Sequence, residues 1–287
     1  RMQTQTPVIY DSFNAEYDLQ RSIYEAERRN LRRLPGTLYS LIQTRRLTRF
    51  ERNVCQSVAH VVAVSDTDAE AFERLAPGVP VTVVSNGIHV APFENADSSL
   101  NLGPNALVFT GSMGYRPNVD AALWFAEQVL PKVRSRISDA KFFVVGSQPH
   151  ARLDALRNRA DVEVTGWVPE VAPFLYAAAV YVVPLRMGSG TRLKLLQAMA
   201  AKQAIVSTTM GAQGLNITSG QELWLADSAG DFASAIIDLL ENPEHRANCV
   251  EAGARYVKNH HDWSVIVPSL LKVYDQIQTN REVVSTK

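Results

Sequence analysis

Apolar residues from residue 106 onward follow two patterns that alternate along the chain. Short runs rich in aliphatic and aromatic residues, typical of buried strands, occupy residues 106–110, 141–145, 161–164, 180–183, 204–207 and 222–225. Apolar residues at helical spacing occupy 118–134, 150–158, 171–178, 191–201, 229–241, 243–259 and 264–278. Strands that alternate with helices predict an α/β fold with a doubly wound parallel sheet.

The chain before residue 106 shows a shorter form of the same alternation. Strands are predicted at 7–11, 60–64 and 81–84, and helices at 16–33, 37–57 and 65–76. Residues 88–105 lack periodicity and are rich in Pro, Asn and Ser, which is typical of a linker. This pattern predicts one domain over residues 1–95 and a second from residue 96 onward.

The stretch from residue 184 to 201 contains the clearest candidate for a ligand-binding site. A buried strand leads into a tight turn and a helix start formed by Gly188, Ser189, Gly190 and Thr191. Arg192 and Lys194 fall in the first helical turn, where the helix dipole disfavours cations. A phosphate group bound at the helix N-terminus explains both bases. The alternative is a plain strand–helix turn with two solvated bases.

Two further glycine turns follow predicted strands, at residues 111–114 and 146–147. Ligands of doubly wound sheets bind outside the carboxyl ends of the strands, so these turns are candidate ligand contacts. Neither turn has the glycine spacing of a dinucleotide-binding fingerprint, and no P-loop lysine pattern occurs. A dehydrogenase or a P-loop kinase is therefore not expected.

Composition narrows the class of protein. The chain has 287 residues, 46% of them hydrophobic, and its 29 Lys and Arg balance its 29 Asp and Glu. Zero net charge gives no bulk attraction to nucleic acid or membrane. Cys55 and Cys249 are predicted to be free thiols in a reducing compartment. No apolar run is long enough to span a membrane, no signal peptide is recognisable, and the early first strand leads us to expect further sequence upstream.

Positive charge is nevertheless concentrated in one segment of the chain. Residues 21–52 contain nine Arg and three Glu, together with several apolar residues. One interpretation is a basic, partly apolar surface for anionic lipid or an anionic acceptor. The other is a pair of solvated helices whose Arg stems cover apolar surface. No recognised nucleic-acid-binding motif accompanies the charge.

An ordered series of short motifs runs along the chain. The series is Asp11-Ser12-Phe13-Asn14-Ala15-Glu16-Tyr17, Val64-Ser65, Asn86-Gly87-Ile88, Phe109-Thr110-Gly111-Ser112-Met113, Pro117-Asn118-Val119-Asp120, Val144-Val145-Gly146, Gly166-Trp167-Val168, Pro184-Leu185, residues 188–194 and Gly211-Ala212-Gln213-Gly214. Each motif alone is typical of an ordinary turn. The ordered set, from about residue 7 to residue 278, resembles the C-terminal two-thirds of a GT-B glycosyltransferase of the large retaining family four.

The resemblance implies a GT-B-like fold of two Rossmann-like domains, with the donor in the C-terminal domain and the acceptor in the N-terminal one. Residues 96–263 would form the nucleotide-sugar-binding domain. Residues 1–95 would form a partial N-terminal domain, to which residues 264–287 cross back. A complete N-terminal domain would need roughly another hundred residues before residue 1.

The resemblance also implies roles for individual residues. Arg192 and Lys194 would neutralise the diphosphate leaving group without a metal ion, and Ser189 would touch the sugar. The other implied donor contacts are Gly111, Ser112, Arg116, Gly146, Trp167, Val168, Gly188, Gly190, Thr191 and Gln197. Trp167 is a candidate for stacking on the base, although an indole packed beneath the sheet is the commoner arrangement. No cofactor is expected beyond the donor, a nucleotide-diphosphate sugar such as a UDP- or GDP-sugar.

Three positions depart from the family pattern. Ser189 and Gln197 stand where the family typically has two glutamates, and Phe13 stands where a histidine is often found. A neutral Gln197 can still hydrogen-bond a ribose hydroxyl. Asn14 and Glu16 beside Phe13 are either acceptor contacts or a cap and a solvated carboxylate.

The expected activity is transfer of a sugar, with retention and without metal, to a glycan, lipid or other acceptor in cell-surface polysaccharide biosynthesis. The expected location is cytoplasmic, peripheral to the inner membrane through the Arg-rich helices, with no nucleic-acid partner. The alternative is a non-catalytic nucleotide- or phosphate-binding fragment, or one half of a split assembly. A GT-B-fold epimerase is a third alternative, but no acid/base residues for it stand out.

Overall fold

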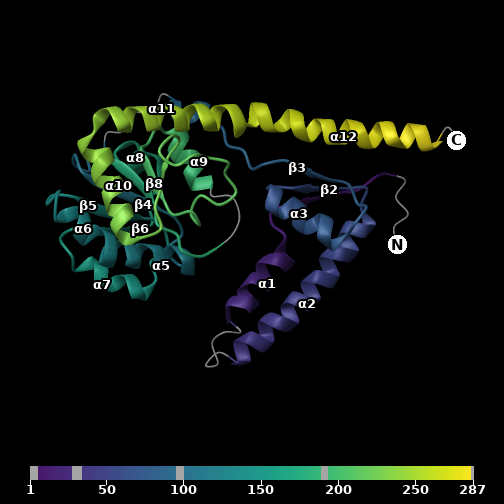
Figure 1. The fold of residues 1–287 in the computed structure, drawn as a ribbon, viewed down its shortest axis with the longest axis horizontal. Coiled ribbons are helices and arrows are strands. Elements are labelled where there is room, and N and C mark those ends of the chain that lie inside the picture. Colours follow the sequence, from purple (N-terminus) through teal and green to yellow (C-terminus); the bar gives the residue numbers. More distant parts are fainter. Residues whose placement is uncertain (1–5, 28–33, 95–99, 189–192, 286–287) are drawn as a thin grey trace. The chain divides into compact units, whose positions relative to one another are not determined.

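The structure is a computed structural model that describes residues 6–27, 34–94, 100–188 and 193–285 (Figure 1). Its internal contacts divide these residues into two compact units. The smaller unit comprises the described residues of Arg1–Asn86 and Ser264–Lys287, and the larger unit comprises those of Gly87–Gly188 and Arg192–Trp263. Each unit has its own sheet and its own hydrophobic core.

The larger unit is built on a six-stranded, entirely parallel sheet in the order β6-β5-β4-β7-β8-β9. Its strands are β4 (Ala106–Thr110), β5 (Lys141–Val145), β6 (Val162–Gly166), β7 (Val180–Val183), β8 (Ile205–Ser207) and β9 (Trp224–Leu225). The strand β4 and its neighbour β7 are buried along their whole length, because helices cover both faces of the sheet. The predicted doubly wound parallel α/β fold is therefore confirmed.

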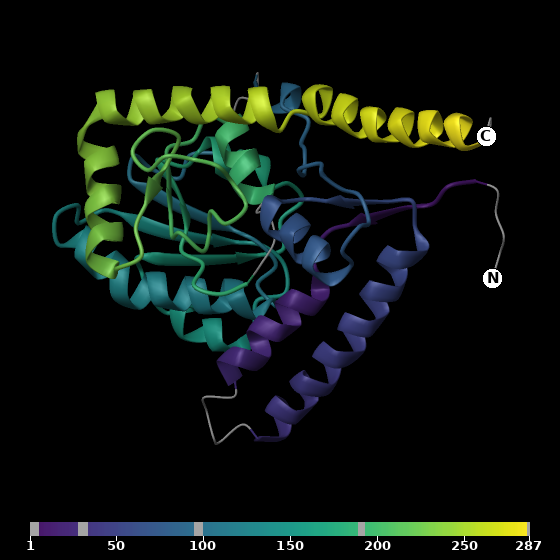
Figure 2. The same cartoon turned by 45° about the vertical axis from the view of Figure 1, so that its right-hand side comes forward.

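The helices of the larger unit follow the strands in alternation (Figure 2). They are α4 (Ala91–Glu94), α5 (Arg116–Trp124), α6 (Leu130–Arg134), α7 (Asp154–Arg157), α8 (Ala172–Tyr176), α9 (Leu193–Ala200), α10 (Ala229–Glu241) and α11 (Pro243–His260). The helix α10 packs with α6, and α11 packs with α9, which places helices in two layers around the sheet.

One predicted helix, residues 118–134, is interrupted. A π-helical turn, Phe125–Val129, separates α5 from α6. Pro131 in the first turn of α6 has no N–H to donate to a carbonyl one turn earlier, so regular α-helical bonding cannot continue through it.

The boundary between the units differs from the predicted one near residue 95. Residues 87–94 belong to the larger unit, because Ile88 and Val90 are buried in its core. The Ile88 N–H donates to the His261 carbonyl at 2.8 Å, and the Val90 N–H donates to the Asp262 carboxylate at 3.1 Å. These bonds hold the first residues of the predicted linker in the larger unit.

The smaller unit contains a parallel three-stranded sheet in the order β1-β2-β3. Its elements are β1 (Ile9–Ser12), β2 (His60–Ala63), β3 (Val81–Val83), α1 (Glu16–Glu27), α2 (Leu34–Ser57), α3 (Asp66–Leu75) and, from Ser264 onward, α12 (Trp263–Ser285). Ile266 and Val273 of α12 pack with Val62 and Val84, so the last helix contributes to the core of the N-terminal sheet. None of the described helices is long and apolar enough to cross a membrane.

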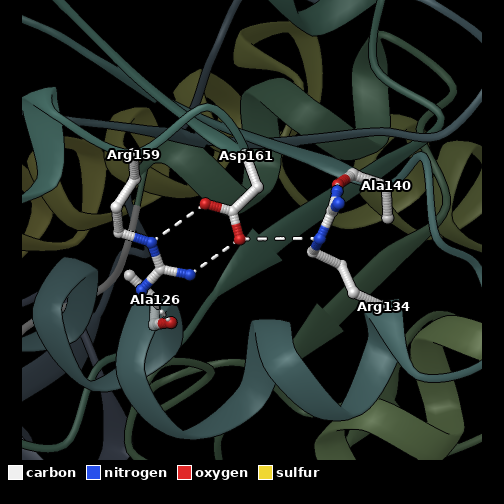
Figure 3. Close-up of polar contacts among 5 residues, drawn as sticks. All are labelled: Ala126, Arg134, Ala140, Arg159 and Asp161. Carbon is white, nitrogen blue, oxygen red and sulfur yellow. Dashed lines mark hydrogen bonds and ion pairs between the residues drawn. The ribbon is translucent and has the colours of Figure 1, made fainter.

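A cluster of charges joins the segment that leads into β6 to the π-helical turn and α6 of the larger unit (Figure 3). Arg159 donates to both carboxylate oxygens of Asp161, at 2.9 and 2.7 Å, and to the Ala126 carbonyl at 2.8 Å. Arg134 lies 3.6 Å from the same carboxylate and donates to the Ala140 carbonyl at 2.6 Å. The Arg159 hydrogen bonds hold the pKa of Asp161 below its usual value.

Replacing Asp161→Asn is expected to lower the free energy of unfolding by about 1–2 kcal/mol at neutral pH, because charge-assisted hydrogen bonds are lost. The folded pKa of Asp161 is lowered. Its contribution is therefore present above the unfolded pKa of about 3.9 and is lost as the pH falls through the folded pKa. Urea unfolding at pH 7 and at pH 2.5–3 measures both effects.

Tryptophan fluorescence follows this unfolding, because the larger unit holds all four tryptophans of the chain, Trp124, Trp167, Trp224 and Trp263. Asp154→Asn is the matched control, since Asp154 pairs with Arg157 at 3.3 Å with both side chains largely exposed. An undiminished difference between wild type and Asp161→Asn in acid would contradict the pKa assignment.

Candidate functional site

The candidate site lies at the carboxyl ends of three neighbouring strands. The glycine turns at Gly111, Gly146 and Gly188 follow β4, β5 and β7, which are adjacent in the sheet order β5-β4-β7. All three strands are parallel, so their carboxyl ends share one edge. The strand order reverses direction between β4 and β7, and such a switch point is where doubly wound sheets bind ligands.

The first two turns are in direct backbone contact. The Gly111 N–H donates to the Val145 carbonyl at 3.0 Å. A Cβ atom built on Gly146 would lie 1.8 Å from the Gly111 carbonyl oxygen, and one on Gly111 would lie 2.7 Å from the Asn118 amide nitrogen. Gly146, with φ of 147°, also has a backbone conformation that L side chains rarely adopt. Gly146 therefore has no room for a side chain against the Gly111 backbone, whereas the atoms closest to a Cβ on Gly111 belong to the Asn118 and Lys194 side chains.

The positively charged side chain of Lys194 lies at this edge of the sheet. It lies in the first turn of α9, and its Nζ donates to the Thr110 carbonyl at 2.6 Å and to Asn118 Oδ1 at 3.1 Å. The same Nζ lies 4.5 Å from the centroid of the Phe109 ring. The ammonium group is therefore held at the end of β4, against the Gly111 turn.

Asn118 is a site residue that the sequence analysis did not identify. Its side chain is buried, and its amide donates to the Ser112 carbonyl at 2.9 Å while its oxygen accepts from Lys194. It thus fixes both the turn and the cation. One signal was present in the sequence: Asn118 lies on the same helical stripe as Ala122 and Phe125, and a polar residue on a buried stripe needs hydrogen-bond partners.

A second connection joins α5 to the loop that precedes Gly188. Arg186 donates to both oxygens of Asp120, at 3.0 and 2.8 Å, and its guanidinium lies 5.4 Å from the centroid of the Trp124 ring. A hollow of about 420 Å³ beside it is lined by Asp120, Leu123, Trp124, Glu127, Gln128, Arg152 and Arg186, and none of these was predicted as a site residue. The ion pair ties the β7–α9 loop to the helix that carries Asn118.

Four predicted residues, Ser189, Gly190, Thr191 and Arg192, lie outside the described residues. The predicted partnership of Arg192 with Lys194 therefore stays a prediction. Gly188, the last described residue before them, has φ of 112°, in the region that favours glycine.

The remaining predicted donor contacts are mostly at the surface. Ser112, Arg116 and Gln197 are exposed, and the Trp167 side chain, which follows β6, is 73% exposed. Val168 is half-buried against the core. Within the described parts of the chain, Arg116, Trp167 and Gln197 form no hydrogen bond with the Gly111 turn, so their roles remain predictions.

The candidate residues of the smaller unit form a local arrangement. Phe13 is 74% exposed at the end of β1. Beside it, the Asn14 side chain donates to the Glu16 carboxylate at 3.4 Å. Across the described residues of both units, no three His, Cys, Asp or Glu side chains are grouped as metal ligands.

Comparison with known proteins gives a consistent result. Residues 104–242 match the protein family Glycosyl transferases group 1. A phosphatidyl-myo-inositol mannosyltransferase of Mycolicibacterium smegmatis is 29% identical, over 75% of this chain and 57% of that protein. The protein of the same name from Mycobacterium tuberculosis strain H37Rv is 28% identical, over 79% of this chain and 62% of that protein. This chain thus spans about 60% of the length of these curated relatives.

Solved structures show the same fold. Sucrose-phosphate synthase from Thermosynechococcus elongatus superposes with a TM-score of 0.70 at 16% identity, covering 98% of this chain and 70% of that one. Anabaena Alr3699/HepE in complex with UDP and glucose gives a TM-score of 0.68 at 12% identity, covering 94% and 72%. These similarities agree with the GT-B-like fold expected from the sequence motifs.

Gly146→Ala is expected to destabilise the larger unit by about 3 kcal/mol or more, because a Cβ would overlap the backbone of the adjacent turn. Gly230→Ala is the control: a Cβ there, in the first turn of α10, has Ser228 Oγ at 3.8 Å as its nearest neighbour. Tryptophan fluorescence during urea unfolding compares the two variants. Equal stability of both variants would show that the two turns do not pack as described.

Proposed function

We propose, on the premise that residues 104–242 belong to the glycosyl transferases group 1 family, that this chain carries the donor site of a glycosyltransferase. The reaction would move a sugar from a nucleotide-diphosphate sugar to a glycan, lipid or other acceptor. One observation carries the proposal: the Lys194 ammonium is fixed against the Gly111 turn at the switch point of the sheet.

The chemistry of sugar transfer fits this placement. When the bond between the sugar and the diphosphate breaks, negative charge builds on the departing oxygen. A cation that is already held in position stabilises that charge without reorganising during the reaction. The Thr110 carbonyl and Asn118 hold the Lys194 ammonium at 2.6 and 3.1 Å, so its position does not depend on the ligand.

The proposal extends to a mechanism with retention and without metal. Lys194, with Arg192 from the segment outside the described residues, would supply the positive charge that a divalent ion supplies in other transferases. Ser189 and Gln197 replace the acidic pair of related sequences, and Gln197 is exposed on α9, available to hydrogen-bond a ribose.

The exposed Trp167 supports a role in holding the base. Its indole is not packed beneath the sheet, because 73% of it is exposed after β6. An exposed ring beside the carboxyl edge of the sheet is suited to stacking on a nucleobase. The neighbouring Val168 packs on the core and anchors the turn.

The names of the relatives and of the solved structures support the proposed classes of donor and acceptor. The mycobacterial relatives are named phosphatidyl-myo-inositol mannosyltransferases, and the Anabaena HepE structures contain UDP-glucose or UDP and glucose. We therefore propose a UDP- or GDP-sugar donor and a glycan or lipid-linked acceptor, used in the cytoplasm for cell-surface polysaccharide synthesis.

A second candidate function is a non-catalytic nucleotide-binding fragment or one half of a split assembly. It is favoured by Ser189, Gln197 and Phe13, which depart from the family pattern. Both candidates bind the donor, and only the first transfers or hydrolyses it.

Nucleotide binding tests the donor site. Isothermal titration with UDP, GDP and ADP is expected to show binding of one of them. Lys194→Met should weaken that binding about 10- to 100-fold, the equivalent of one or two charge-assisted hydrogen bonds. Lys132→Met, at an exposed position of α6, is the control and should leave the affinity unchanged. Equal affinity in folded wild type and Lys194→Met would remove the basis of the proposal.

Donor turnover separates the two candidate functions. Incubation with the nucleotide sugar of the bound base should release nucleoside diphosphate, and excess EDTA should leave the rate unchanged, because the cations belong to the protein. Nucleotide binding without turnover would favour the non-catalytic alternative. Loss of turnover in EDTA, recovered with Mg²⁺, would contradict metal independence.

A further inference from the structure

Two hollows of the larger unit share Lys202, at the end of α9 opposite Lys194. The first, of about 200 Å³, is called here the basic hollow, and it is lined by Val90, Ala200, Lys202, Ala254, Arg255 and Lys258. The second, of about 350 Å³, is called the apolar hollow, and it is lined by Lys202, Arg246, Leu239, Leu240, Pro243, Ala247 and Val250. The helix α11, which packs against both α9 and α10, contributes to both hollows (Figure 1).

The two hollows are parts of one groove along α11. Five residues of this helix line one hollow or the other at spacings of three or four: Pro243, Ala247, Val250, Ala254 and Lys258. Residues three and four apart share a face of a helix, so these five form one stripe, which is about 22 Å long at about 1.5 Å per residue. Lys202 lines both hollows and therefore marks where they meet. A single ligand of moderate size can occupy both.

The charged side chains that line this groove are all positive. Lys202, Arg255 and Lys258 line the basic hollow, and no Asp or Glu of the described chain lines either hollow. Lys202, Arg246 and Arg255 form no ion pair with any residue that the structure describes. The hollow beside Trp124, in contrast, is lined by two acids and two bases. A cleft with charge of one sign and apolar walls concentrates its potential on a ligand of the opposite sign.

The backbone of Lys202 supports a role for its side chain. Its φ of 54° lies in the left-handed region that favours glycine. The Lys202 N–H donates to the Met199 carbonyl, and the Gln203 N–H donates to the Ala198 carbonyl, both at 3.0 Å. Glycine is the usual residue at a turn that ends a helix in this way. A cation does favour the carboxyl end of α9, but this does not explain Arg255, which lies outside the last turn of α11.

The groove favours a ligand with a compact anionic group and an apolar body. Three bases around a hollow of about 200 Å³ suit a phosphate group, which carries nearly two negative charges at neutral pH and three acceptor oxygens. The buried Leu239 and the half-buried Leu240 and Val250 offer apolar surface to the rest of the molecule. Because these groups line hollows, a soluble molecule reaches them more readily than a flat surface does.

We propose that this groove binds a soluble phosphate monoester with an apolar organic body. The phosphate lies in the basic hollow, against Lys202 and Arg255, and the body lies in the apolar hollow, against Val250. This site is separate from the donor site, because Lys194 lies in the first turn of α9 and Lys202 follows the last turn. The proposal does not depend on sugar transfer, since the residues of the Gly111 turn take no part in it.

Binding of phenyl phosphate to the full chain, measured by ligand-observed NMR, tests the proposal. Wild type should bind phenyl phosphate at least tenfold more tightly than phenol or inorganic phosphate, because each of these fills one hollow only. Lys202→Gly should weaken binding at least tenfold, the equivalent of one charge-assisted hydrogen bond. Its melting temperature should equal or exceed that of wild type, because glycine suits this φ. Val250→Thr should lower the preference for phenyl phosphate over inorganic phosphate several-fold, since a hydroxyl then lines the apolar hollow.

Arg152→Gln is the matched control, because it removes an exposed arginine from the charge-balanced hollow beside Trp124 and should leave the affinity unchanged. Lys194→Met should also bind phenyl phosphate as wild type does. Loss of binding in Lys194→Met but not in Lys202→Gly would place the phosphate at the donor site and overturn the proposal. Equal affinity in wild type and Lys202→Gly, or no binding of phenyl phosphate to wild type, would contradict it as well. Binding only to vesicles that contain phosphatidic acid would assign the bases to a lipid headgroup instead.

Discussion

The contact between two backbone turns determines the geometry of the candidate site. The turns after β4 and β5 approach so closely that a single Cβ on Gly146 would overlap the Gly111 carbonyl. With no side chains between them, the peptide groups of the two turns meet at the carboxyl edge of the sheet. Lys194 can then reach the end of β4 from the neighbouring helix, where its Nζ meets the Thr110 carbonyl. A larger residue at Gly146 would push these groups apart.

Two polar connections keep the helices in register with that edge. Asn118 joins Lys194 to the Ser112 carbonyl, and the Asp120–Arg186 ion pair joins the same helix to the loop before Gly188. Both start from α5, one turn or less apart. The helix that follows the first glycine turn thereby positions the cation of the third. Such preorganisation is what a site needs in order to stabilise charge that appears during a reaction.

The two units use their arginines differently. In the larger unit, Arg134 and Arg159 lie beside the Asp161 carboxylate, which lowers the pKa of that carboxyl and fixes the start of β6. On α2, Arg46 and Arg49 stand among exposed apolar residues, and the nearby Glu51 is turned inward to cap α1. A chain with no net charge can therefore still hold a basic helix, because α2 contains four Arg and one Glu.

The sequence by itself determined the alternation of strands and helices, the parallel sheet and the positions of the glycine turns, because periodicity and glycine placement are local properties of the chain. Only the tertiary structure showed that Asn118 holds Lys194 and that Asp120 holds Arg186, because these partners are 76 and 66 residues apart in the sequence. The spacing of apolar residues predicts which positions are buried, but it does not predict which residues contact each other. It also moved the unit boundary from about residue 95 to residue 86, because backbone bonds to His261 decide where Ile88 belongs. The exposure of the Trp167 and Phe50 side chains likewise depends on the tertiary structure, because no neighbouring element of the described chain covers them.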